Sequence, residues 1–147
     1  MSRPDDSDNP LYAAIEILVY GLIYVFSRAY RTELNYPAES ADRSKPNVLS
    51  DDTKTINLRV VAPADFYKFS ANGTCRKYDL QWFEKALDDG LTAFLRTPTA
   101  APDLSTLHLG MTFGFEEIEQ SFIKPVPDHG FVMSFEPTPV QWNEAAA

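Results

Sequence analysis

Large apolar residues alternate with small or polar residues most regularly in the stretch 107–117, LHLGMTFGFEE. A period of two is typical of a strand with one buried face, so this stretch predicts a strand. Glycine in a strand interior gives up side-chain packing, which indicates that another backbone or helix lies close to the second face. That face carries His108, Gly110, Thr112, Gly114 and Glu116. It is also the surface that a small ligand would use if the chain binds one.

The first long apolar run has a helical period and predicts a helix over residues 10–32. Asn9 is a favourable N-cap, and Pro10 suits the first helical position. One face of this helix combines tyrosines with small residues, which is typical of packed helix pairs and of protein interfaces. Two explanations remain open, namely self-association through this face and coverage by the following loop. The opposite, more apolar face is expected to lie in the core and holds Leu11, Ile15, Leu18, Val19, Leu22, Val25 and Phe26. The interface residues expected on the tyrosine face are Ile17, Tyr20, Gly21 and Tyr24.

This helix is not expected to cross a membrane. Its apolar part runs from Leu11 to Ser27 and contains Glu16, whereas a span needs about 20 apolar residues. The polar arm at residues 1–9 lacks the basic and then apolar order of a secretory signal. We therefore expect a cytoplasmic or virion-associated protein that is not secreted.

The remaining pattern predicts a long polar loop at 33–54, a strand at 56–62 and a hairpin about Asn72 and Gly73. A second helix is expected from an N-cap at Asp79 to Pro98, with Asp88 and Asp89 on its solvated face. Residues 118–124 fit either a strand or a helix, and a last strand is expected at 131–135. The tail, 137–147, contains Trp142, which we expect to dock on its own chain or on a neighbour and count among the interface residues.

This order of elements predicts an α+β fold in two layers. We expect an antiparallel sheet of about five strands, with the N-terminal helix and the middle helix on one face. The 147 residues have the usual size of one domain, so residues 1–147 are predicted to form a single domain. The arm, loop and tail named above are expected to be its irregular parts.

The net charge and the cysteine content argue against a nucleic-acid-binding protein and against a protein stabilised by an internal disulfide. The chain carries 21 acidic and 13 basic residues, a formal net charge of −8, which disfavours nucleic acid as the main partner. Cys75 is the single cysteine, so no internal disulfide can form.

Candidate catalytic and metal-binding residues are few. His108 and His129 lie near Glu116, Glu117 and Asp128 only if the fold brings them together, and their spacing matches no zinc motif. The acidic cluster that contains Glu119 is expected to be solvated, although paired carboxylates are also used in acid–base catalysis. No nucleophile elbow or phosphate-binding loop is found in the sequence. We expect no catalytic residue, no metal and no cofactor.

The predicted function is therefore a non-enzymatic assembly or interaction subunit that self-associates or docks in a larger complex. A similar order of elements occurs in small ring-forming virion components, an analogy at the level of the fold alone. One alternative is an acidic inhibitor or immunity-type protein that binds a basic partner. Another is a small-ligand module or enzyme that uses the face of strand 107–117.

Overall fold

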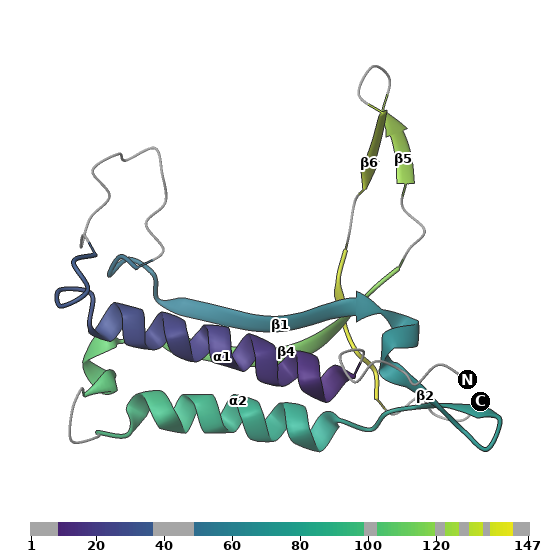
Figure 1. Ribbon diagram of the computed structural model, residues 1–147, viewed down its shortest axis with the longest axis horizontal. Coiled ribbons are helices and arrows are strands. Elements are labelled where there is room, and N and C mark those ends of the chain that lie inside the picture. Colours follow the sequence, from purple (N-terminus) through teal and green to yellow (C-terminus); the bar gives the residue numbers. More distant parts are fainter. Residues whose placement is uncertain are drawn as a thin grey trace.

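The computed structural model describes residues 9–36, 49–98, 103–119, 123–126, 130–133 and 136–142. The fold is α+β, as predicted (Figure 1). Residues 1–8, the middle of the long loop at 37–48 and the end of the tail at 143–147 lie outside the described residues. The elements are α1 (Pro10–Ala29), β1 (Thr55–Pro63), η2 (Ala64–Tyr67), β2 (Lys68–Ala71), β3 (Thr74–Lys77), α2 (Gln81–Arg96), η3 (Leu104–Leu107), β4 (Gly110–Ile118), β5 (Ile123–Val126), β6 (Gly130–Met133) and β7 (Thr138–Pro139).

The main sheet is built on the parallel pair of β1 and β4. Their register runs from Thr55 opposite Gly110 to Pro63 opposite Ile118. The short β7 adds an antiparallel pair at the far end of β4, which gives the order β1-β4-β7. The expectation of a single antiparallel sheet is therefore wrong. The chain between β1 and β4 includes α2. A helical crossover of this length brings the chain back to the end of the sheet where β1 begins, so the next strand runs parallel to β1.

The other strands pair in two separate antiparallel hairpins, β2 with β3 and β5 with β6. The turn between β2 and β3 is formed by Asn72 and Gly73, both with positive φ angles, of 52° and 76°. These angles explain the Asn-Gly pair, because a tight hairpin turn requires left-handed residues. The described ends of the ambiguous segment 118–124 are extended, since β4 ends at Ile118 and β5 begins at Ile123.

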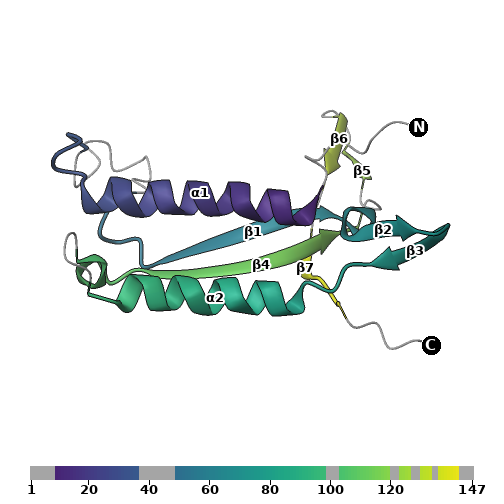
Figure 2. The ribbon, with the colours of Figure 1, turned by 60° about the horizontal axis from the view of Figure 1, so that its bottom comes forward.

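The two helices pack against different strands, α1 against β1 and α2 against β4 (Figure 2). Helix α1 lies over the apolar face, where Gly21 approaches Leu58 and Met111. Helix α2 follows the outer edge of β4, and its carboxylates accept backbone N–H groups of that strand. The predicted placement of both helices side by side on one face is therefore not confirmed.

The core is built on the apolar face of β4, as the alternating pattern predicts. Leu109, Met111, Phe113 and Phe115 are all at most 8% exposed. Phe115 makes edge-to-face ring contacts with Tyr67, Phe113 and Trp142. Such contacts fix ring orientation in addition to burying apolar area.

Helix α1 turns its small residues inward and many of its large residues outward. Ala14 and Val25 are fully buried, and Gly21 is buried with them. The expectation that Ile15, Val19, Leu22 and Phe26 lie in the core is wrong, because all four are exposed. Small residues on the inner face allow the helix to approach the sheet closely.

Candidate functional site

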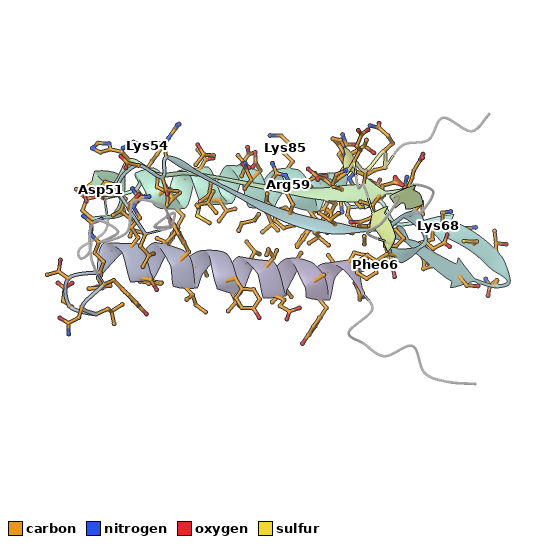
Figure 3. All side chains as sticks on the ribbon, turned by 90° about the horizontal axis from the view of Figure 1, so that it is seen from above. Asp51, Lys54, Arg59, Phe66, Lys68 and Lys85 are labelled. Atoms are coloured by element: carbon orange, nitrogen blue, oxygen red, sulfur yellow. The ribbon has the colours of Figure 1, made fainter. Side chains whose placement is uncertain are left out.

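The outward-facing residues of α1 form a continuous apolar surface, which we call the outer stripe. Figure 3 shows side chains of α1 on the side of the helix away from the strands. They recur every three or four positions, so they share one side of the helix. Between Pro10 and Ala29, Glu16 is the one exposed charged residue, since Arg28 is buried. The stripe consists of Tyr12, Ile15, Val19, Tyr20, Leu22, Ile23, Phe26 and Tyr30, which are 37–60% exposed.

Most of the interface residues predicted from the sequence lie elsewhere. Gly21 is buried, and a Cβ atom there would lie 2.7 Å from Cδ1 of Leu58. Ile17 and Tyr24 are half-buried and pack against the core. Trp142 is 9% exposed and docks on its own chain. Of the five, Tyr20 belongs to the outer stripe.

Helix α1 is long and apolar enough to cross a membrane by length and composition, with a mean hydropathy of 1.6. The core helix of a soluble protein or a signal sequence passes the same test, so length and hydropathy alone do not identify a membrane span. The described structure packs one side of the helix on β1.

The second face of the sheet carries a polar network centred on Arg59. Its guanidinium donates a hydrogen bond of 3.0 Å to Oγ1 of Thr112, and Nε lies 3.3 Å from Oε1 of Glu116. The Thr112 hydroxyl donates in turn to Oδ1 of Asn57 at 2.7 Å. This network engages Glu116, which the sequence alone had placed on a candidate ligand face.

Gly114 is covered by side chains of its own chain. A Cβ atom at this position would lie 3.1 Å from Oε1 of Glu84 and 3.5 Å from Cδ of Arg59. Gly110 is exposed, and its nearest neighbours are Lys54 and Thr55 of the same chain. At Gly114, side chains from α2 and β1 therefore take the place of the backbone or helix that the glycines predict. At Gly110 the predicted covering is wrong, because this residue is exposed.

Two carboxylates of α2 bind the outer edge of β4, in an arrangement we call the carboxylate ladder. Oε1 of Glu84 accepts the N–H of Phe115 at 3.2 Å, and Oδ1 of Asp88 accepts the N–H of Phe113 at 2.9 Å. Four residues of a helix advance about 6 Å and two residues of a strand about 6.6 Å, so the two repeats nearly match. The ladder supplies acceptors for two N–H groups of β4 that have no neighbouring strand to bond to.

The ladder corrects the assignment of Asp88 to a solvated face. Its neighbour Asp89 is exposed and pairs with Lys85 at 2.7 Å, as expected for a solvated residue. The four-residue spacing of Glu84 and Asp88 on a helix next to a strand is the signal that sequence analysis missed.

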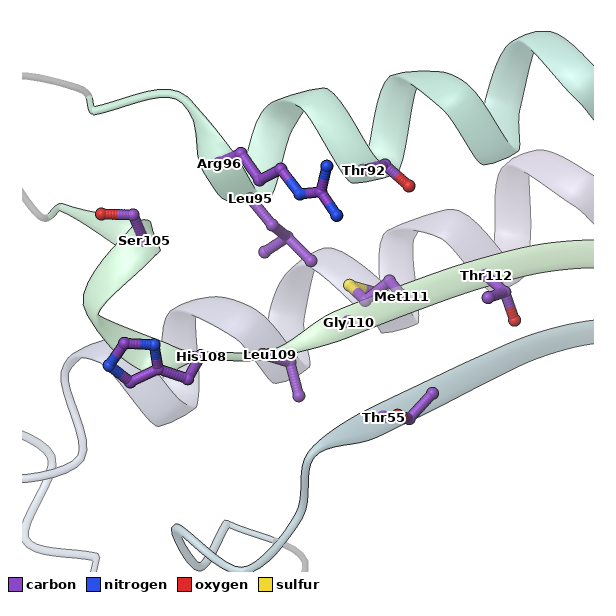
Figure 4. A pocket seen from close by; sticks show the side chains of 10 residues that line it. All are labelled: Thr55, Thr92, Leu95, Arg96, Ser105, His108, Leu109, Gly110, Met111 and Thr112. Atoms are coloured by element: carbon purple, nitrogen blue, oxygen red, sulfur yellow. The ribbon is translucent and has the colours of Figure 1, made fainter.

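Beyond Asp88 the space between α2 and the start of β4 opens into a pocket of about 620 Å³ (Figure 4). Thr92 and Arg96 line it from α2, and His108, Gly110 and Thr112 line it from the strand side. Three residues of the predicted ligand face therefore meet here, whereas Gly114 and Glu116 lie under Arg59.

His108 precedes β4 rather than lying within it. It ends η3 with a φ of 47°, in the left-handed region that residues other than glycine seldom adopt. Its ring lies at the end of the pocket in Figure 4.

Among the described residues, no group of three His, Cys, Asp or Glu side chains is arranged to hold a metal ion. His129 and Asp128 lie outside those residues. Glu117 is engaged by Lys77 at 3.3 Å, and Cys75 is exposed on β3.

Comparison with protein-family models, with curated proteins and with solved structures finds no match for this chain.

Proposed function

We propose that this protein is a non-enzymatic assembly subunit that pairs with a second copy of itself through the outer stripe of α1. The exposure of the stripe carries the proposal. Soluble proteins seldom leave a continuous row of large apolar side chains in water unless the row marks an interaction site.

The size of the outer stripe suits a stable interface. An aromatic side chain has roughly 150–250 Å² to bury, and the eight stripe residues are 37–60% exposed, so together they offer several hundred Å². A standard interface buries about 800 Å² per partner, so little more than the stripe is needed. Its flanking tyrosines suit the polar rim of such an interface.

The position of Glu16 favours an antiparallel pair of helices. A two-fold axis near the midpoint of the stripe, at residue 21, would hold the two Glu16 carboxylates about 15 Å apart along the axis. A parallel pair would bring them side by side in an apolar interface, which costs free energy through repulsion and desolvation. The antiparallel arrangement also sets the two helix dipoles in opposite directions.

A lipid surface suits the outer stripe less well. Helices that lie on membranes have Lys and Arg along their polar margins. The exposed charge of α1 is instead Glu16, and the chain has a net charge of −8, which anionic lipids repel. Binding to anionic vesicles by the native chain, with no dimer in solution, would support a membrane role and contradict the proposal.

Cross-linking at two stripe positions tests the proposal and its orientation. In a Cys75→Ser background, Ile23→Cys places a thiol near the expected two-fold axis, and Tyr12→Cys places one near the end of the stripe. The paired positions 23 and 12 would be separated along the axis by about 6 Å and about 27 Å respectively. A short bismaleimide is expected to join Ile23→Cys into a covalent dimer and to leave Tyr12→Cys monomeric.

Trp82→Cys supplies the control, because Trp82 is 67% exposed on α2, outside the outer stripe. Equal cross-linking of Trp82→Cys and Ile23→Cys would show random collision and contradict pairing through the stripe. Efficient cross-linking at both 12 and 23 would contradict the antiparallel orientation.

A further inference from the structure

The pocket at the start of β4 lies where the carboxylate ladder would continue. The ladder pairs Glu84 with Phe115 and Asp88 with Phe113, and the same spacing brings Thr92 opposite Met111. The Thr92 hydroxyl donates to the backbone oxygen of Asp88 at 3.1 Å. The third step of the ladder therefore has no carboxylate of its own.

At this third step, the backbone N–H of Met111 is the donor that has no carboxylate opposite it. In a parallel pair, alternate residues of a strand bond to the neighbouring strand. The backbone N–H groups of Met111, Phe113 and Phe115 therefore all point away from β1. No hydrogen-bond acceptor for the Met111 N–H is found among the described residues. Met111 as a whole is 2% exposed and lines the pocket, so the acceptor that its N–H lacks has to come from the pocket.

Arg96 supplies a positive charge at the same place. It lies one helical turn beyond Thr92, and Figure 4 shows its side chain extending along the pocket. It has no ion pair with any described residue. None of the described residues that line the pocket has a carboxylate, although the chain as a whole is acidic.

Apolar side chains complete the pocket. Leu95, Leu109 and Met111 are buried and line it together with the polar groups. The volume of about 620 Å³ is within the range of small-molecule sites, which combine apolar walls with a few polar anchors.

We propose that this pocket binds a small organic anion whose carboxylate or phosphate group takes the third step of the ladder, accepting the Met111 N–H and pairing with Arg96. The apolar part of the ligand lies against Leu109 and Leu95. Arg96 also lies in the last turn of α2, where a cation is stabilised by the helix dipole without any ligand. The experiment must therefore report on the Met111 N–H and not on the stability of α2 alone.

The probe is phenyl phosphate, titrated into the native full-length chain and followed by the amide resonance of Met111. A saturable shift is expected, together with a response of the His108 ring. Benzyl alcohol, which has the ring without the charge, is expected to produce none. Inorganic phosphate is expected to bind more weakly, and equal affinity would overturn the apolar part of the assignment.

Two variants and one control locate the anion. Arg96→Ala is expected to raise the Kd for phenyl phosphate at least about tenfold, since a charge-assisted bond is lost. Arg76→Ala removes the same charge from the exposed hairpin and is expected to leave the Kd unchanged. Thr92→Asp places a carboxylate at the third step and is expected to remove the response while the other resonances keep their folded positions.

The proposal is overturned if the Met111 resonance of the native chain shows no saturable shift. It is also overturned if Arg96→Ala and Arg76→Ala bind phenyl phosphate equally. Neither result depends on the outer stripe, so the pocket and the self-association of the chain are tested separately.

Discussion

The indole N–H of Trp142 donates a hydrogen bond of 2.8 Å to Oε2 of Glu84, which ties the C-terminal segment to α2. The other oxygen of the same carboxylate accepts the N–H of Phe115 in β4. One side chain thus joins three parts of the chain that are distant in sequence.

Replacing Glu84 is therefore expected to destabilise the fold at two places. Glu84→Ala should lower the free energy of unfolding by about 2–4 kcal/mol, because two donors lose a charged acceptor. Glu84→Gln should cost roughly half as much, since the amide keeps one acceptor oxygen. Urea unfolding followed by circular dichroism measures both changes. Equal stability of the native chain and Glu84→Ala would contradict a stabilising role for the bonds of Glu84 to Trp142 and Phe115.

Asp88 and Asp89 are adjacent carboxylates with different surroundings, so they form a matched pair. Asp88→Ala removes the acceptor of the Phe113 N–H and is expected to cost about 1.5–3 kcal/mol. Asp89→Ala breaks an exposed pair with Lys85 and is expected to change the stability little. Thermal unfolding of the two variants decides the point, and similar melting temperatures would argue against the carboxylate ladder.

Gly21 and Gly90 are both within helices, but only Gly21 meets a neighbour. Gly90→Ala has open space for its methyl group and is expected to stabilise the chain by about 0.5–1 kcal/mol, the usual gain of Ala over Gly in a helix. Gly21→Ala meets Leu58 and Met111 and is expected to show no such gain. Gly21→Leu should destabilise by about 1–3 kcal/mol through overpacking. A gain at position 21 equal to that at position 90 would contradict the close contact of α1 with the sheet.

The Tyr67 phenol is expected to make stability depend on pH in alkaline solution. Burial, and then the nearby charge of Glu117, raise the pKa of this phenol above its ordinary value. The unfolded chain loses the phenolic proton near pH 10 while the folded chain keeps it, so the contribution of Tyr67 falls as the pH rises above about 10.

Tyr67→Phe has no such proton and serves as the comparison. The variant loses the hydroxyl, whose single proton is shared between the backbone oxygens of Val60 and Glu116, each 2.8 Å away, so it should be about 1–2 kcal/mol less stable near neutral pH. The difference is expected to narrow above about pH 10 in urea unfolding curves. A difference in stability that stays constant with pH would mean that the phenol of the folded chain has its ordinary pKa, which would contradict the prediction.

Local patterns predict much of this fold. The period of two in residues 107–117 identifies the buried face of β4, and Asn72 with Gly73 identifies the hairpin, because both signals depend on neighbours in sequence. The direction of β1 relative to β4 could not be predicted in this way. Alternation shows which face of a strand is buried and says nothing about which strand pairs with it.

The orientation of α1 and the role of Asp88 could not be read from hydrophobicity either. A ranking by apolar character places Ile15 and Phe26 inside, whereas close packing on the sheet selects Ala14 and Gly21. A carboxylate in the middle of a helix is usually solvated, and Asp88 differs because an open strand edge lies within its reach.

The central proposal, pairing through the outer stripe, is tested most directly by the mass of the particle in solution. Multi-angle light scattering of the native chain at micromolar concentration is expected to give twice the mass of one chain. Ile23→Arg, in the stripe, should give the mass of one chain with an unchanged circular dichroism spectrum, while Trp82→Arg, outside the stripe, should remain dimeric. A native chain that has the mass of one copy, or a dimer that Ile23→Arg leaves intact, would contradict the proposal.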